Sequence, residues 1–271
     1  MDATSQENAR KARTQHWSAY PVAKARRIDN IYKTMPTGAH VRDVMIDALR
    51  PLLPSGRVLD VGCGTGYLTI SLHDAGYQTT GLDVSNGMLE VFKENAAGRD
   101  IRLIFGDIFE MRPPDEKFDA VTCRNVFSHY PDFGAFLKRI SDYVADGGHI
   151  IFDSFSSEAI DTAAALLSLP ADEVRAKVFG TLAHFSRIEL EEFCAKNGMQ
   201  VIDRYASAFF HRNPLFATFI EPIAEYDAQL VENINNPDVK KFMSWFQASI
   251  AAKLPSTLSG SVINIIRKSP T

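Results

Sequence analysis

Short apolar runs alternate with helical patterns between Val58 and Phe155, and this alternation most restricts what the chain can fold into. In the last helical pattern, apolar side chains recur at helical spacing from Phe133 to Val144, and Gly147 is expected to end the helix. Strands joined through helices form a parallel sheet that helices cover on both faces. The sequence therefore predicts an α/β fold. The predicted strands are "VLDV", "QTTGLD", "IRLIFGD", "FDAVTCR" and "HIIFDSF".

The pattern changes after Phe155. Residues 157–180 predict helices broken at Pro170, and Ser186 with Glu189 forms a capping-box pattern ahead of another helix. Two further strands are predicted at "MQVIDRYASAFF" and "VINIIRK". The segment between them has a mostly helical pattern and is rich in aromatic side chains.

These patterns divide the chain into four parts. We expect an N-terminal helical arm or lid at 1–50 and an α/β core at 51–210. A helical insertion at 211–261 is expected to cap the bound acceptor, and residues 262–271 supply the final strand of the core.

Composition excludes several classes of protein. The net charge of −4 argues against a general nucleic-acid binder. No apolar run is long enough to span a membrane and no apolar leader precedes the arm, so we expect a cytoplasmic protein. Cys63, Cys123 and Cys194 are far apart and match no metal spacing, so we expect a reducing compartment and no metal.

The N-terminal arm is locally basic. Between Arg10 and Lys33 the basic residues outnumber the acids, of which Asp29 is the sole example. Such a segment is typical of a solvated arm. The alternative is a lid whose cations meet an anionic substrate.

The stretch "RVLDVGCGTGYLT" places a glycine-rich turn after the first strand. Ligands of open α/β sheets bind beyond the carboxyl ends of the strands. A dinucleotide fingerprint needs glycine or alanine at the sixth position from Gly62, where this chain has Tyr67. Asp60 would repel a pyrophosphate but attract an ammonium group, by about 4 kcal/mol at 4 Å and an effective dielectric near 20. The alternative is that Asp60 faces solvent and caps the following turn.

Together with the later motifs, this loop resembles the first motif of class I S-adenosylmethionine-dependent methyltransferases. The motifs "GLDVS", "GDIF" and "FDAVTCRNVFSHYPD" follow in the family's order, and the resemblance covers about residues 40–155. It implies a Rossmann-like seven-stranded mixed sheet of order 3-2-1-4-5-7-6. The last strand is antiparallel, helices lie on both faces, and here a helical cap is added.

The resemblance also implies how S-adenosylmethionine binds. Asp83 would hold the ribose hydroxyls, Asp107 would meet the adenine amino group, and Ile108 would contact the ring. Backbone near Arg124 and Asn125 would face the methionine part. The full set implied is Asp60, Gly62, Cys63, Gly64, Gly66, Asp83, Val84, Met88, Asp107, Ile108, Arg124 and Asn125.

His129 is the expected general base, since it follows the fourth strand near the expected position of the methyl donor. Alternatively, it packs against its loop. Asp153 would orient His129 or grip the substrate, and otherwise is a solvated strand end. Tyr20, Tyr130 and Trp245 are expected to contact the acceptor, although aromatic side chains at such positions also pack as core.

These observations favour an enzyme that transfers a methyl group to a small molecule, with a hydroxyl acceptor first and an amine second. The alternatives are a cofactor-binding protein without catalysis, a methyltransferase acting on a protein, and an NAD-dependent oxidoreductase. The sequence leaves open whether the chain is a monomer or a homodimer.

Overall fold

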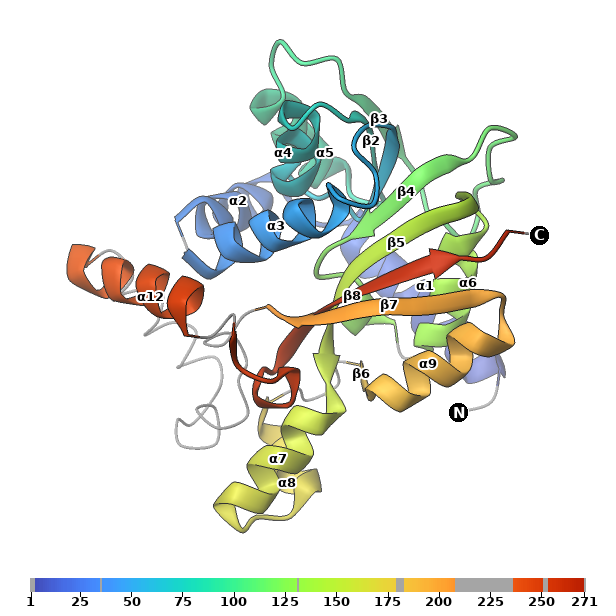
Figure 1. Ribbon diagram of the computed structural model, residues 1–271. Helices are drawn as coiled ribbons and strands as arrows, with labels where there is room; N and C mark the ends of the chain where they lie inside the picture. Colours follow the sequence, from blue (N-terminus) through green and yellow to red (C-terminus); the bar gives the residue numbers. More distant parts are fainter. Residues whose placement is uncertain are drawn as a thin grey trace.

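The computed structural model describes residues 3–34, 36–130, 132–178, 183–207, 236–250 and 253–270. Its centre is a twisted, mostly parallel sheet (Figure 1). The strands are β1 (Arg57–Val61), β2 (Gln78–Asp83), β3 (Arg102–Phe105), β4 (Phe118–Cys123), β5 (Val144–Ser156), β6 (His184–Phe185), β7 (Met199–Ala206) and β8 (Ser261–Lys268). The α-helices are α1 (Ala3–Ser18), α2 (Val22–Thr34), α3 (Pro36–Leu49), α4 (Tyr67–Asp74), α5 (Asn86–Asn95), α6 (Phe133–Ser141), α7 (Ser157–Leu167), α8 (Ala171–Val178), α9 (Arg187–Lys196) and α12 (Pro237–Ser249). Two 3-10 turns, η1 (Phe127–His129) and η3 (Ser256–Leu258), complete the described elements.

The strand order is β3-β2-β1-β4-β5-β8-β7. Strands β1 to β5 run parallel, and β8 is antiparallel to both of its neighbours, β5 and β7. The predicted order and the antiparallel final strand are confirmed. The two-residue strand β6, which the sequence patterns did not indicate, pairs with the end of β5.

Two hydrophobic layers cover the sheet. On one face, Val41 and Met45 of α3 and Leu72 of α4 pack against Val58 and Ile151 of the sheet. The other layer contains helical side chains from α6 and α9, including Phe136, Leu137, Ile140, Leu190 and Cys194. Helix α3 thus contributes to the core although it lies within the segment assigned to the arm. The domain boundaries stay a prediction.

The expected helix from Phe133 to Gly147 is wrong at its C-terminal end. Helix α6 stops at Ser141, and Val144 already belongs to β5, where it pairs with Phe118 of β4. The reason is that an apolar residue at this spacing suits a buried strand as well as a helix. Gly147 has φ +77° and lies inside β5, close to a shift in the β4–β5 register.

Other local predictions hold. Ser85 caps α5, accepting a hydrogen bond from the Met88 backbone N–H, and Ser186 and Glu189 form the reciprocal capping box of α9. The helices on either side of Pro170 are α7 and α8. Strand β7 ends at Ala206, four residues before the predicted end, and residues 208–235 lie outside the described residues. In the parts that the structure describes, no helix is both long and apolar enough to cross a membrane.

The glycines of the loop after β1 serve different purposes. A Cβ at Gly62 would lie 2.3 Å from Val126 Cγ2, so the chain's own packing requires glycine there. Gly64, by contrast, has open space around its Cβ position. Both have positive φ, +70° and +54° respectively, which glycine adopts without strain.

This difference predicts that Gly62→Ala is the more damaging substitution. Overpacking costs about 1–3 kcal/mol and a left-handed alanine about 1–2 kcal/mol, so Gly62→Ala should lower the free energy of unfolding by about 2–5 kcal/mol. Gly64→Ala, the matched control, should cost only about 1–2 kcal/mol, because alanine there is strained by the left-handed backbone but meets no neighbouring atom. Urea unfolding measures both, and Gly62→Ala combined with Val126→Ala should recover part of the loss. Equal costs for the two single variants would contradict the packing argument.

Candidate functional site

A cavity of about 490 Å³ opens where the parallel strands end. Its wall includes residues of β1, β2 and β5, the glycine loop and the loop after β4, together with side chains of α1 and α2. Among the predicted site residues, it brings together Asp60, Gly62, Cys63, Gly64, Asp83, Val84, Met88, Ile108, Arg124, Asn125, His129, Tyr130 and Asp153.

Asp83, the last residue of β2, is held by backbone donors. The Gly64 N–H donates to its Oδ2 and the Ser85 N–H to its Oδ1, each at 2.8 Å. Burial raises the pKa of Asp83 to about 6, although these hydrogen bonds favour the charged form. Each oxygen keeps further acceptor capacity, so the carboxylate can receive two O–H donors from a ligand.

Asp60 does not face solvent. It is buried in β1, where it accepts hydrogen bonds from Thr69 Oγ1 at 2.6 Å and from Thr122 Oγ1 at 2.9 Å. Burial raises the pKa of Asp60 to about 6, and the two hydroxyls and the charge of Arg124 oppose that rise. The structure therefore contradicts the alternative of a solvent-facing Asp60.

Asp153 lies in β5 and shapes the loop after β4. Its Oδ1 accepts the Asn125 N–H at 2.6 Å, and Asn125 is held at φ +57°. The Asn125 side chain in turn donates to the Tyr32 hydroxyl at 2.9 Å. Burial raises the pKa of Asp153 to about 6, against the opposing charge of Arg124. Asp153 is therefore no solvated strand end.

His129 ends η1 and lines the cavity beside Trp17 of α1, with the two ring centroids 5.2 Å apart. Tyr130 follows it, and its ring stacks on Phe136 at 4.1 Å. Burial raises the pKa of Tyr130 far above its ordinary value, so its hydroxyl stays protonated. His129 is thus the imidazole that this loop contributes to the cavity wall.

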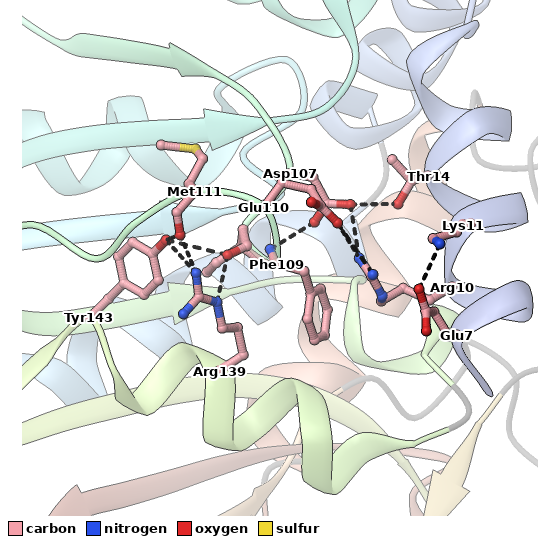
Figure 2. Close-up of polar contacts among 11 residues, drawn as sticks. Glu7, Arg10, Lys11, Thr14, Asp107, Phe109, Glu110, Met111, Arg139 and Tyr143 are labelled. Carbon is pink, nitrogen blue, oxygen red and sulfur yellow. Dashed lines mark hydrogen bonds and ion pairs between the residues drawn. The ribbon is translucent and has the colours of Figure 1, made fainter. Parts of the chain in front are cut away.

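Helix α1 is attached to the loop after β3 by polar contacts (Figure 2). Thr14 Oγ1 donates to Asp107 Oδ2 at 2.8 Å, and the Phe109 N–H donates to Asp107 Oδ1 at 2.9 Å. Arg10 lies 3.3 Å from Glu110 and 3.6 Å from Asp107. The Asp107 carboxylate thus faces α1, while its neighbours Gly106 and Ile108 line the cavity. Its contact with an adenine amino group stays a prediction.

The basic arm pairs mostly with the protein's own acids. Beyond Arg10, the pairs are Lys11–Glu7, Arg26–Glu94 and Lys33–Asp29. Arg13 lines the cavity instead. Arg10 and Arg26 therefore join the arm to residues of the core, whereas Lys11–Glu7 and Lys33–Asp29 are pairs within one helix. Whether the arm acts as a lid stays a prediction.

Besides Asp107, three predicted residues are not part of the cavity wall. Gly66 precedes α4, and a Cβ there would lie 2.5 Å from the Phe92 ring. Tyr20 packs on Trp17, and Trp245 lies on α12 with 54% of its surface exposed. The roles assigned to these residues stay predictions.

Sequence reasoning missed several residues of the site. Thr69 and Thr122 hold Asp60, Thr14 holds Asp107, and Tyr32 contacts both Arg124 and Asn125. Most of these partners are 62 to 93 residues apart in the chain, so no local pattern marks them. Among the described residues, no three His, Cys, Asp or Glu side chains gather as a metal ion would require.

Comparison with known proteins gives matches along most of the chain. Residues 38–204 match a family model described as "Methyltransferase domain". A ubiquinone biosynthesis O-methyltransferase from Alkalilimnicola ehrlichii is 35% identical over 107 residues, which are 38% of this chain and 43% of the relative. A demethylmenaquinone methyltransferase from Staphylococcus aureus is 38% identical over 99 residues, which are 35% of this chain and 41% of the relative. The chain thus spans less than half the length of these curated relatives.

A solved structure shares the fold. The crystal structure of magnesium protoporphyrin IX methyltransferase from Synechocystis PCC 6803 with bound SAH has a TM-score of 0.51 and 16% sequence identity, covering 84% of this chain and 81% of that one.

The buried carboxylates predict a pH-dependent cost to stability. Because the folded-state pKa of Asp153, about 6, exceeds its ordinary value of 3.8, protonation favours folding. The stability that protonation of Asp153 contributes is fully present below about pH 4 and is lost as the pH rises through 6. Asp153→Asn has no such charge to bury. The free energy of unfolding of the variant minus that of the wild type should therefore rise by on the order of 2 kcal/mol from pH 4 to pH 8.

Urea unfolding of both proteins across this pH range measures the effect. Asp115→Asn is the control, because the Asp115 side chain is 99% exposed. A difference between Asp153→Asn and the wild type that does not change with pH would show that Asp153 ionises normally.

Proposed function

The chain belongs to the methyltransferase-domain family and has its S-adenosylmethionine-dependent methyltransferase fold, and from this premise we propose that it methylates a hydroxyl group of a small molecule. The observation that carries the proposal is the cavity itself. It holds the glycine loop and Asp83 together with His129. An amine acceptor is the second choice, since none of the described residues that line the cavity requires an oxygen acceptor over a nitrogen one.

The residues present fit S-adenosylmethionine. The space around Gly64 leaves room for a ligand against the loop backbone, and the Asp83 carboxylate retains lone pairs for two ribose hydroxyls. Val84, Met88 and Ile108 give the same wall an apolar surface, against which an adenine ring would pack. When bound, the cofactor supplies a methyl group already activated by a positively charged sulfur.

The chain's own contribution is then orientation and proton removal. Holding an acceptor in line with the methyl group can supply an effective molarity of about 10⁵–10⁸ M. An aliphatic hydroxyl must also lose a proton, and His129 lies on the cavity wall to accept it. The Trp17 ring packs edge-on against His129 and so would limit the orientations of the imidazole.

The relatives' names support this class of reaction without giving the substrate. The Alkalilimnicola ehrlichii protein is an O-methyltransferase of ubiquinone biosynthesis, and the Staphylococcus aureus protein acts on demethylmenaquinone. By analogy, we propose an acceptor with substantial apolar surface. The cavity wall also includes apolar side chains that suit such an acceptor, among them Ile28, Ile31, Val41 and Phe155.

Binding of S-adenosylhomocysteine tests the cofactor. The wild type should bind this product of the cofactor in calorimetry and should not bind NADH. Asp83→Asn should weaken the affinity about 10- to 100-fold, because a charged acceptor for the ribose hydroxyls is lost. Unchanged affinity would remove Asp83 from the cofactor site, and a wild type that binds NADH instead would overturn the proposal.

Methyl transfer to a panel of hydroxyl- and amine-bearing small molecules tests the reaction. His129→Ala should lower kcat by about 10²–10⁴-fold with a hydroxyl acceptor if His129 is the base. Its affinity for S-adenosylhomocysteine should change little. A loss under about threefold would assign His129 to packing, and binding without turnover on any acceptor, including protein substrates, would indicate a binding protein.

A further inference from the structure

One amide side chain joins the glycine loop to the N-terminal arm. Asn95, the last residue of α5, donates a hydrogen bond to the Thr65 carbonyl oxygen at 2.9 Å and another to Asp29 Oδ1 of α2 at 3.0 Å. Its side-chain oxygen accepts a hydrogen bond from Lys33 Nζ at 2.8 Å. An asparagine amide has two N–H donors, so each donor has a partner here. The amide therefore connects α2, α5 and the loop after β1.

Charge holds the α2 side of this connection in place. Lys33 Nζ lies 2.6 Å from Asp29 Oδ2, and the Asp29 side chain is only 11% exposed. A buried carboxylate needs partners, and Asp29 has them in Lys33 and in the Asn95 amide. When α2 is docked, it thus fixes the orientation of the amide that also reaches the loop.

The loop residue that Asn95 holds lies between two glycines. Gly64 and Gly66 have positive φ, +54° and +87°, and glycine has more conformational freedom than any other residue. Hydrogen bonds to β2 fix the part of the loop before Thr65. Thr65 itself lines the cavity, whereas Asn95 is not part of the cavity wall. The hydrogen bond from Asn95 therefore restrains the loop from outside the cavity.

We propose that Asn95 is a positioning residue that couples the docking of α2 to cofactor binding. A ligand binds more weakly when its loop adopts the binding conformation in only a fraction of the molecules. Asn95 raises that fraction by restraining the Thr65 carbonyl group, and Asp29 extends the restraint to α2. By linkage, a bound cofactor in turn stabilises the docked position of α2. This inference rests on the proposed cofactor but depends on neither the acceptor nor the proposed base.

Calorimetry with S-adenosylhomocysteine tests the role of Asn95. Asn95→Ala should weaken the affinity about 3- to 10-fold, the effect of one net hydrogen bond. Asn95→Asp keeps the shape and the acceptor for Lys33 but loses both N–H donors, so it should weaken the affinity at least as much.

Glu94→Gln is the matched control. Glu94 is the neighbouring residue of α5, and its exposed ion pair with Arg26 joins the same two helices but not the loop. Because an exposed ion pair contributes little, this variant should change the affinity for S-adenosylhomocysteine less than about twofold. A loss in Glu94→Gln equal to that in Asn95→Ala would show that any loosening of α2 weakens binding, and would remove the specific role of Asn95.

A double-mutant cycle separates coupling from a role confined to the loop. If the restraint passes from α2 through Asp29 to Asn95, Asp29→Ala should weaken S-adenosylhomocysteine binding by a similar factor. The double variant should then bind no more weakly than Asn95→Ala alone. If the two single losses multiply in the double variant, the residues act independently and the coupling is refuted.

Urea unfolding of the same variants separates positioning from stability. A lower free energy of unfolding in Asn95→Ala, with unchanged affinity for S-adenosylhomocysteine, would assign Asn95 to stability alone and overturn the inference. A wild type that does not bind S-adenosylhomocysteine would overturn the proposed cofactor and this inference together. A wild type that binds it as expected but methylates no small molecule would leave the inference standing and remove the proposed reaction.

Discussion

The hydrogen bond from the Gly64 N–H to the Asp83 carboxylate is the contact on which the site depends. It connects the loop after β1 to the end of β2, and so fixes the glycine turn relative to the one carboxylate that ends its neighbouring strand. The Gly62 and Cys63 N–H groups both donate to the Leu82 carbonyl oxygen, which adds to the same connection. A loop held this way presents its backbone to a ligand at little cost in conformational freedom when the ligand binds.

Burial of charge is the second constraint. Asp60, Asp83 and Asp153 are all buried near the carboxyl ends of strands, and burial raises the pKa of each to about 6. Such an arrangement opposes folding, so a sequence selected for stability alone would not keep three of them around one cavity. Their partners are backbone N–H groups and threonine hydroxyls, which leave the carboxylates ionisable and oriented.

Sequence reasoning reached the sheet order and the cavity wall around Asp60 to Asn125 because those residues lie in ordered local motifs. It failed where the same spacing of apolar residues fits both a helix and a strand. Val144 has the spacing of a helix but pairs as a strand, since burial against Phe118 satisfies its side chain and backbone together. It also could not find the long-range partners. Tyr32 is hydrogen-bonded to Asn125, and Thr14 to Asp107, and the two residues of each pair are 93 positions apart in the sequence.

The position of β8 has a consequence for how the molecule assembles. This strand is the last described element in the chain, yet it lies inside the sheet between β5 and β7. Residues 261–268 are synthesised after β5 and β7, so the two strand edges that β8 pairs with have no partner strand until these residues have been made. An unpaired strand edge invites pairing with other chains. Pairing of β8 covers both edges at once, and Ser261, its first residue, also lines the cavity.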